Sequence, residues 1–134
     1  MFRILLVDDE PAVLRLLQTV LEAESFQIVT AKSASEAKSL LGKTEFDLVL
    51  TDMRMETSMA GYDVVRAARQ LHPRPAIAIL TAFPISRSEW QPSGADALFV
   101  KGTEILNLPD QLKALLKRRP KTEPAKNSQQ RRSV

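Results

Sequence analysis

The residues of this 134-residue chain that could do chemistry are three carboxylates, a hydroxyl and an amine, which follow short apolar runs. They are Asp8, Asp9, Asp52, Thr81 and Lys101. Carboxylates that lie close together repel one another, so the pKa of one of them should rise unless a cation is present. Hard oxygen ligands favour Mg²⁺, which keeps several waters and accepts a phosphate as a further ligand.

A lysine and a hydroxyl beside such a cation would complete a site for phosphoryl transfer. Lys101 offers a point charge to a phosphoryl oxygen, and Thr81 can donate a hydrogen bond to another. Phosphoryl transfer depends mainly on positioning and charge neutralisation, so one aspartate could act as the nucleophile and form an acyl phosphate. Each residue alone would be interpreted as a helix cap or a solvated side chain. Their placement after four separate runs favours one shared site.

The apolar runs before these residues predict the strands that must position them. The runs are Arg3–Val7, Phe26–Thr30, Phe46–Thr51, Ala76–Leu80 and Ala97–Val100. Consecutive apolar residues are typical of strands buried on both faces, as in a parallel sheet. Alternation with helical patterns predicts a doubly wound α/β fold with a five-stranded parallel sheet, right-handed crossovers and helices on both faces. In such a sheet, ligands bind beyond the carboxyl ends of the strands.

Four segments between and after the strands have the spacing of apolar residues that is typical of amphipathic helices. The apolar positions are Val13, Leu17, Val20 and Leu21; Ala37, Leu40 and Leu41; Val64, Val65, Ala68 and Leu71; and Leu108, Leu112, Leu115 and Leu116. Ser33 and Glu36 form a capping box before the second segment, and Gly42 follows it. We therefore predict a helix in each segment.

Prolines complicate the last of these segments and one further segment. Residues 83–93 contain Pro84 and Pro92 and leave room for roughly two helical turns, so the helix before the last strand is predicted to be short. Pro109 lies near the start of the last helix. That helix begins either near Asn107 or at Thr103 with a kink at the proline.

Composition excludes several classes of site. The chain has no cysteine and a single histidine, His72, which excludes disulfides, zinc–thiolate sites, cysteine nucleophiles and two-histidine metal sites. His72 is expected at the surface near a helix end. No apolar run approaches the ~20 residues that span a bilayer, and the first residues lack the features of a signal peptide. We therefore expect a cytoplasmic protein without a membrane segment.

Charge is unevenly distributed along the chain. Residues 117–134 hold seven Lys or Arg and one acid, Glu123, so they carry +6 and leave −3 on residues 1–116 of the net +3. We predict a folded domain over residues 1–118 and a basic, disordered tail or linker over 119–134, because the latter has no apolar periodicity. The acidic domain itself is not expected to bind nucleic acid.

The segments ILLVDDE, DLVLTDMRM, AILTA and GADALFVKG resemble the signatures of the response-regulator receiver domain, over about residues 2–118. The resemblance implies a flavodoxin-like receiver fold, in two-component phosphorelay signalling, with Asp52 as the phosphoacceptor. It also implies that Asp9 and Asp52 bind Mg²⁺ directly, that Asp8 binds it through water, and that the main-chain carbonyl of Arg54 completes the protein ligands. Thr81 would bind the phosphoryl group and shift as the switch, and Lys101 would contact the phosphoryl oxygens.

The function implied by the resemblance is that of a signalling switch. The domain would take its phosphoryl group from a phosphohistidine of a histidine kinase or phosphotransfer protein. It would catalyse only its own phosphorylation and dephosphorylation, and would signal to a protein partner or effector domain. A stand-alone, chemotaxis-type regulator, a part of a longer protein, and a homodimer all stay open.

Rival interpretations remain beside this one. A receiver-like interaction module that does not use phosphate is the main alternative. An aspartate-nucleophile phosphatase usually has a general acid two residues after the nucleophile, where this chain has Arg54. A flavodoxin would need a phosphate loop after the first strand, and Asp8, Asp9 and Glu10 would repel that phosphate.

Several positions depart from the family pattern. Leu98 replaces an aromatic residue usual three positions before the lysine, and Gly102 replaces a proline after it, so a trans bond is expected there. The loop after Asp52 is one residue longer than usual and has Glu56 where a proline is common. With the short fourth helix, these changes predict an atypical output surface. Arg54 and Phe83 are expected to flank the path of hydrolytic water; alternatively, Phe83 packs beside Trp90.

Overall fold

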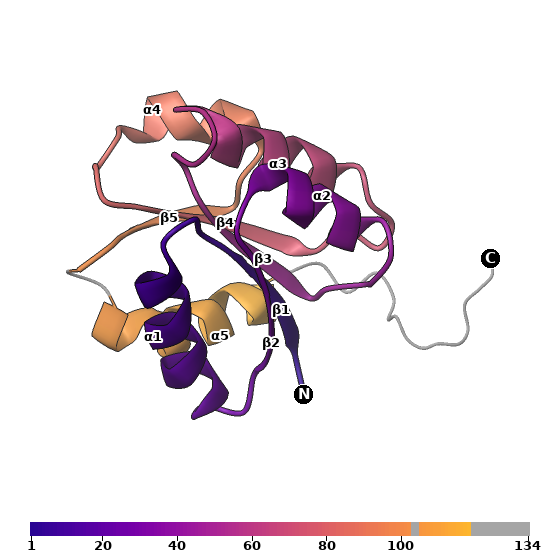
Figure 1. Cartoon of the computed structure of the whole chain (residues 1–134), viewed down its shortest axis with the longest axis vertical. Helices are drawn as coiled ribbons and strands as arrows, with labels where there is room; N and C mark the ends of the chain where they lie inside the picture. The colour runs from indigo at the N-terminus through magenta and orange to yellow at the C-terminus, as the bar shows by residue number, and fades with distance from the viewer. Residues whose placement is uncertain (103–104, 119–134) are drawn as a thin grey trace.

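The computed structural model describes residues 1–102 and 105–118, in which strands and helices alternate (Figure 1). The strands are β1 (Arg3–Val7), β2 (Gln27–Ala31), β3 (Leu48–Asp52), β4 (Ala76–Thr81) and β5 (Ala97–Val100). The helices are α1 (Pro11–Glu22), α2 (Ala34–Leu41), α3 (Ala60–Arg69), α4 (Arg87–Trp90) and α5 (Leu108–Arg118), with short 3₁₀ turns η1 (Gln91–Ser93) and η2 (Ile105–Asn107). The predicted tail over 119–134 and the alternative helix start at Thr103 lie outside the described residues.

All five strands are parallel and lie in one sheet of order β2-β1-β3-β4-β5. The chain moves to one side of β1 to form β2 and then returns to the other side to form β3. The topological switch point, where ligands bind in such sheets, therefore lies between β1 and β3. This doubly wound arrangement confirms the predicted fold class.

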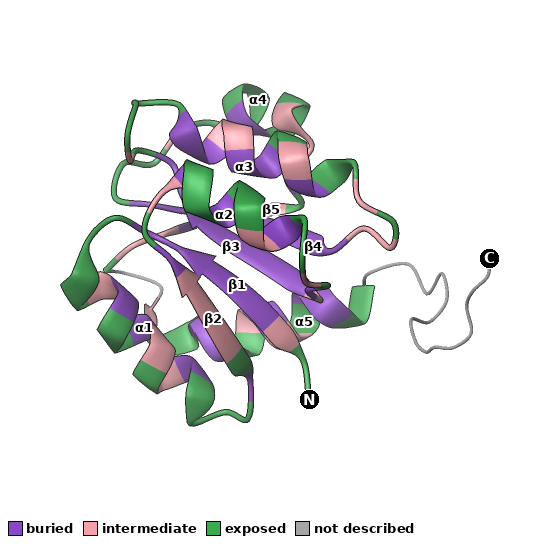
Figure 2. Cartoon of the chain, turned by 45° about the vertical axis from the view of Figure 1, so that its right-hand side comes forward, coloured by how far each residue is buried: buried purple, intermediate pink, exposed green. Residues whose placement is uncertain are grey.

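Helices cover both faces of the sheet, as predicted: α1 and α5 lie on one face, and α2, α3 and α4 lie on the other (Figure 1). Successive residues of each strand point to opposite faces of the sheet, so they pack against the two helix layers in turn. In β1, Ile4 and Leu6 pack with α1 and α5, whereas Leu5 and Val7 pack with α2 and α3. Figure 2 shows the inner strands buried along their length and the helices buried only on their inner sides. The core holds the strand ends in fixed relative positions.

Two strand starts differ from the sequence prediction. Phe26 and Phe46 were predicted to open strands, but pairing begins after them, at Gln27 and Leu48. Both aromatic rings are buried in the core, so their hydrophobicity reflects packing at a turn rather than strand pairing. The strand β2 lies at the edge of the sheet and is half-exposed along most of its length, in contrast to the predicted burial of both faces.

The prolines shape the two segments that were hard to assign. The helix α4 has only four residues, and Pro92 lies in the 3₁₀ turn that follows, which confirms the predicted short helix. Trp90, at the end of α4, is buried in the core and anchors this segment. The helix α5 begins at Leu108 with Pro109 as its second residue, close to the predicted start near Asn107. Proline is tolerated there because the first helical N–H groups have no partner within the helix.

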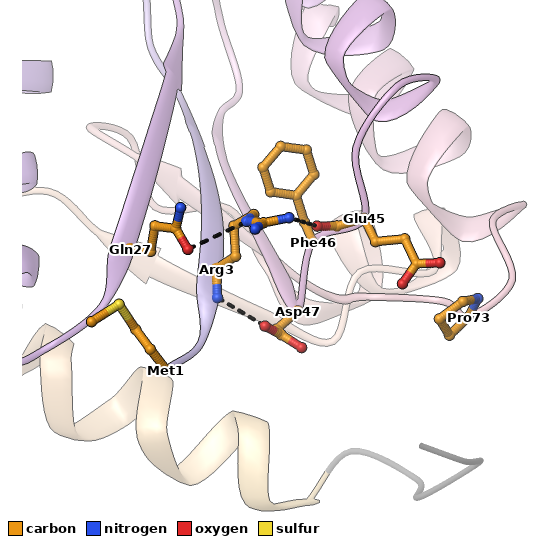
Figure 3. A pocket seen from close by; sticks show the side chains of 7 residues that line it. All are labelled: Met1, Arg3, Gln27, Glu45, Phe46, Asp47 and Pro73. Carbon is orange, nitrogen blue, oxygen red and sulfur yellow. Dashed lines mark hydrogen bonds between the residues drawn. The ribbon is translucent and has the colours of Figure 1, made fainter. Parts of the chain in front are cut away.

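The amino edge of the sheet carries a cavity of about 230 Å³ (Figure 3). Its polar groups bond to one another: the Arg3 side chain donates to Gln27 Oε1 at 3.4 Å and to the Glu45 carbonyl at 3.3 Å, and the Arg3 N–H donates to Asp47 Oδ2 at 2.8 Å. None of the predicted site residues lines this cavity. His72 is exposed at the same edge, as predicted. Within the described part of the chain, no helix has the length and apolar character that crossing a membrane requires.

Candidate functional site

The structure brings the three predicted carboxylates together at the carboxyl edge of the sheet. Asp8 and Asp9 follow β1, and Asp52 ends the neighbouring strand β3. One carboxylate oxygen from each lies within 4.8 Å of the others. Asp8 and Asp52 are buried and Asp9 is exposed, so the cluster opens to solvent on one side. Three oxygen ligands at this spacing could hold a hard metal ion.

Lys101 follows β5, the outermost strand on one side of the sheet, and its side chain extends to the same cluster. Its backbone N–H donates to the Thr81 carbonyl at 2.8 Å, which extends the pairing of β4 and β5 by one bond. Its Nζ lies 2.7 Å from Asp8 Oδ2 and 3.3 Å from Asp52 Oδ2. The side chain is only 14 % exposed, so this ammonium is a largely buried countercharge between two carboxylates. Glu10 lies further out, with Oε1 at 3.8 Å.

Asp8 and Asp52 use their two oxygens in the same way. In each, Oδ1 accepts a main-chain N–H of the following loop: Glu10 N–H at 3.0 Å for Asp8, and Met53 N–H at 2.8 Å for Asp52. In each, Oδ2 faces Lys101. Asp8 Oδ2 is fully buried and receives no well-directed hydrogen bond, although Lys101 Nζ is close. The Lys101 ammonium balances part of the negative charge, and the three carboxylate oxygens within 4.8 Å of one another, open to solvent at Asp9, form a donor set that fits a hard metal ion.

Burial controls the electrostatics of this group. Burial and, secondly, the charge of Asp8 raise the pKa of Asp52, while Lys101 and the Met53 N–H oppose the rise. Burial also lowers the pKa of Lys101, but Asp8 and Asp52 together outweigh it, so that the pKa of Lys101 is raised above its ordinary value. Lys101 is therefore positively charged at neutral pH. Asp52 keeps a proton more readily than a carboxyl in water does.

Thr81 ends β4 at the same edge and is buried. Its hydroxyl donates to the Phe83 carbonyl at 3.3 Å and accepts the Phe83 N–H at 3.1 Å. The structure thus places Thr81 at the predicted edge but engages its hydroxyl with the loop after β4. The carboxylates are not its partners in this arrangement.

Arg54 and Phe83 meet above the loops that follow β3 and β4. The guanidinium carbon of Arg54 lies 4.8 Å from the centre of the Phe83 ring, which is a cation–π contact. Phe83 is 57 % exposed, whereas Trp90 is in the core. Phe83 is therefore not buried in the core with Trp90, and Arg54 lies over its ring.

Leu98 lies in β5 opposite Ile79 of β4 and packs against the layer that contains α3 and α4. Its neighbour Phe99 is buried on the opposite face, among residues of α5, as its alternate position in the strand requires. The structure therefore has an aliphatic side chain at the position where the resemblance implied an aromatic one, and Phe99 does not substitute for it because it faces the other layer. Gly102, after Lys101, has a φ of 87°, which favours glycine.

Gly61 is a site residue that the sequence analysis missed. It lies in the first turn of α3, and its N–H donates to the Met53 carbonyl at 2.8 Å. A Cβ at this position would lie 2.5 Å from the Asp52 carbonyl oxygen and 2.6 Å from Met53 Cα. The helix can approach the back of Asp52 only because residue 61 has no side chain. The sequence signal was a glycine at the end of the segment MRMETSMAG, but no local pattern identifies its neighbour.

Glu56 is the second residue whose role was missed, since the sequence showed it only as a departure from a common proline. Its carboxylate accepts the N–H groups of Ala34 at 2.9 Å and Ser35 at 3.2 Å, at the start of α2. The Ala34 N–H is the main cause that lowers the pKa of Glu56. No sequence signal could have found this contact, because the two segments meet only in the folded sheet.

A family model described as the response regulator receiver domain matches residues 4–113. The chain belongs to this family. Receiver domains of response regulators are parts of two-component signalling systems rather than conventional enzymes; they are phosphorylated by histidine kinases and pass the signal to output domains. The match removes the flavodoxin and phosphatase interpretations.

Curated relatives of this receiver domain include a response regulator and transcriptional regulatory proteins. The chain is 39 % identical over 79 residues to the response regulator protein PilR of Pseudomonas aeruginosa, which covers 59 % of the chain and 18 % of PilR. It is 37 % identical over 121 residues to the transcriptional regulatory protein SrrA of Staphylococcus aureus, which covers 89 % of the chain and 49 % of SrrA. The chain thus spans about half or less of the length of these relatives.

Solved structures share the fold. The response regulator TrrA of Thermotoga maritima, in complex with Mg²⁺-BeF, is 34 % identical with a TM-score of 0.76, over 86 % of this chain and 99 % of that one. A CheY-like receiver domain protein of Methanospirillum hungatei is 27 % identical with a TM-score of 0.79, over 88 % and 95 % of the two chains. The receiver fold predicted from the sequence is therefore confirmed.

Proposed function

We propose that this receiver domain accepts a phosphoryl group on Asp52 from a phosphohistidine of a histidine kinase or phosphotransfer protein, in a Mg²⁺-dependent reaction. The observation that carries the proposal is the cluster of Asp8, Asp9 and Asp52, with ligand oxygens within 4.8 Å, closed on its inner side by Lys101. The cluster combines a nucleophile, a metal-binding set and a fixed positive charge at the topological switch point.

The two oxygens of Asp52 have different tasks in this reaction. Met53 N–H holds Oδ1 at 2.8 Å, which fixes the carboxylate and leaves Oδ2 as the nucleophile. Oδ2 attacks the phosphorus atom, the bond between phosphorus and the donor imidazole nitrogen breaks, and the imidazole keeps that electron pair. The acyl phosphate carries its negative charge beside Lys101, which is 3.3 Å from the attacking oxygen and contacts the phosphoryl oxygens.

Asp8, Asp9, Asp52 and the main-chain carbonyl of Arg54 would hold the Mg²⁺, with Asp8 acting through water. The bound ion neutralises charge on the transferred phosphoryl oxygens. Lys101 would provide a second positive charge near the phosphoryl oxygens, one that belongs to the protein itself. The domain acts on no substrate other than its own phosphoryl group, which it gains and later loses by hydrolysis.

The signal would leave the site through Thr81. Its hydroxyl must exchange the Phe83 main chain for a phosphoryl oxygen, which would draw the loop after β4 inward. Leu98 and the four-residue α4 then present an unusual output surface to a protein partner or effector domain. The domain boundary at residue 118, the basic tail, the cytoplasmic location and a homodimer stay predictions.

The test is labelling by a small-molecule phosphodonor. Acetyl phosphate with Mg²⁺ should add one phosphoryl group to the wild-type chain, seen by intact mass, and none to Asp52→Asn. Asp63→Asn, which changes an exposed aspartate on α3, is the control and should label like the wild type. Equal labelling of wild type and Asp52→Asn would contradict the assignment. Absence of both labelling and Mg²⁺ affinity in the wild type would favour the phosphate-independent interaction module.

Phe83 and Arg54 are expected to prolong the phosphorylated state. Phe83→Ala removes the exposed ring on which Arg54 rests and opens the path of water to Asp52. An exposed cation–π contact contributes about 0.5–1 kcal/mol, so the dephosphorylation rate should rise roughly twofold to fivefold. The measurement is the decay of labelled protein after removal of the phosphodonor. Phe2→Ala, which truncates an exposed phenylalanine before β1, is the control; an unchanged lifetime in Phe83→Ala would remove the shielding role.

A further inference from the structure

The loop between β3 and α3, residues 53–59, is joined to α2 by a side chain. Each oxygen of the Glu56 carboxylate accepts one main-chain N–H group: Oε1 accepts that of Ala34 at 2.9 Å, and Oε2 accepts that of Ser35 at 3.2 Å. These are the first two residues of α2. The contact connects a segment that leaves the phosphoacceptor strand to a helix that begins more than twenty residues earlier in the chain.

The helix α2 cannot satisfy these two N–H groups by itself. The side chains of the predicted capping box accept other N–H groups: Ser33 Oγ accepts the Glu36 N–H at 3.0 Å, and Glu36 Oε1 accepts the Lys32 N–H at 2.7 Å. The N–H groups of the first helical turn have no partner within a helix. A carboxylate is the best acceptor for them, because the bond is charge-assisted and the helix dipole favours a negative charge at this end.

The same loop is also held by a main-chain hydrogen bond at its start and by another within the loop. The Gly61 N–H holds the Met53 carbonyl at 2.8 Å, and the Met55 N–H donates to the Thr57 carbonyl at 3.0 Å. Met55 is half-buried against the core. Arg54 lies between Met53 and Met55, so its main chain has its position fixed by the buried residue before it and by the tethered residues after it.

We propose that Glu56 is a positioning residue for metal binding, which holds the 53–59 loop against α2 and thereby keeps the main-chain carbonyl of Arg54 in place as a ligand. The inference depends on the proposed function, since it assumes that this carbonyl binds Mg²⁺. It assigns a task to the residue that replaces the common proline. Proline would stiffen the loop through its own ring, whereas Glu56 achieves the same restraint through two hydrogen bonds to a neighbouring helix.

The experiment measures Mg²⁺ affinity by calorimetry and the hydrogen exchange of the Ala34 and Ser35 amides. Glu56→Ala should expose both amides to faster exchange and weaken Mg²⁺ binding roughly fivefold, as expected for the loss of restraining hydrogen bonds. Glu45→Ala is the matched control, because it removes the same charge from an exposed position at the opposite edge of the sheet. Its Mg²⁺ affinity should equal that of the wild type.

Two further variants separate position from charge. Glu56→Gln keeps one acceptor oxygen and removes the charge. Ala34→Pro keeps the charge and removes one donor; proline suits the first helical position, and Ser33 before it is already extended, with a φ of −157° and a ψ of 163°. The Mg²⁺ affinity of both variants should lie between that of the wild type and that of Glu56→Ala.

The outcomes distinguish this inference from the proposed function. Wild-type affinity in Glu56→Ala, with faster amide exchange, would show a purely structural tether and overturn the inference alone. Equal affinities of Glu56→Gln and Glu56→Ala, with Ala34→Pro like the wild type, would attribute the effect to charge and also overturn it. A wild-type chain that binds no Mg²⁺ would instead overturn the proposed function, and the inference with it.

Discussion

Lys101→Met is expected to lower the free energy of unfolding by about 2 kcal/mol at pH 7, below the range for fully buried ion pairs because the cluster is open to solvent at Asp9. Methionine keeps much of the side-chain volume but leaves the Oδ2 atoms of Asp8 and Asp52 facing each other without a countercharge. Labelling of Asp52 by acetyl phosphate should also fall by at least tenfold, because the phosphoryl oxygens lose their cation. Urea unfolding and intact mass measure the two effects.

The stability loss should depend on pH in a defined direction. The pKa of Asp52 is already raised in the folded chain, so its ionisation opposes folding as the pH rises above the ordinary carboxyl value of about 4. Without Lys101 this opposition grows. The difference between wild type and variant should therefore vanish below about pH 3, and reach its full size by neutral pH. The pKa of Lys101 is raised, so its contribution persists to roughly pH 10 and is lost above it.

Lys113→Met is the control for this variant. Lys113 forms a 2.8 Å ion pair with Glu24, but the two side chains are 43 % and 45 % exposed, so solvent screens the pair and its loss should change stability much less than the loss of Lys101. Added Mg²⁺ should recover part of the loss in Lys101→Met, because it supplies the missing positive charge. A pH-independent loss, or one equal to that of Lys113→Met, would show that the cluster does not depend on this lysine.

Gly61→Ala is expected to destabilise the chain by about 1–3 kcal/mol and to slow labelling of Asp52. The new methyl group would lie 2.5 Å from the Asp52 carbonyl oxygen, so either α3 or the phosphoacceptor strand must move. The neighbours are main-chain atoms, which cannot rotate away. The midpoint of urea unfolding and the labelling rate are the measurements.

Gly42→Ala provides the matched comparison. Gly42 follows the last residue of α2 with an ordinary φ of −77°, and a Cβ there would lie 3.6 Å from the Ser39 carbonyl oxygen, which is an ordinary contact distance. Its replacement should leave stability within about 0.5 kcal/mol of the wild type and labelling unchanged. If both glycine variants behaved alike, the close approach of α3 to Asp52 would not be the cause of the expected loss.

Much of the fold could be predicted from the sequence, because its signals are local. Apolar runs identified the strands, and the order of strands and helices fixed a parallel sheet whose carboxyl ends share one edge. Asp8, Asp9, Asp52 and Lys101 meet there as predicted. The short α4 also followed from local chemistry, since Pro84 and Pro92 limit any helix between them.

Other features depend on contacts between distant segments and carry no local signal. Glu56 bonds to α2, and Gly61 faces the backbone of Asp52, only because the sheet brings these segments together. The exposure of Phe83 could not be predicted either, since an aromatic residue directly before a proline fits the core or the surface equally well. The sequence was sufficient to identify the site residues, but it did not identify Glu56 and Gly61, which hold the surrounding segments in place.

Strand direction explains why carboxylates at the two edges of this sheet have different needs. Asp47 and Asp96 precede strands, at the edge where parallel strands present unpaired N–H groups, and each accepts one: from Arg3 at 2.8 Å and from Ile77 at 2.8 Å. Asp8 and Asp52 lie where the strands present carbonyl oxygens, which repel a carboxylate. Aspartate thus accepts strand N–H groups at one edge of the sheet, whereas at the other edge it needs a positive charge, which Lys101 supplies in part. The direction in which the strand N–H and carbonyl groups point therefore determines which edge of the sheet attracts a cation.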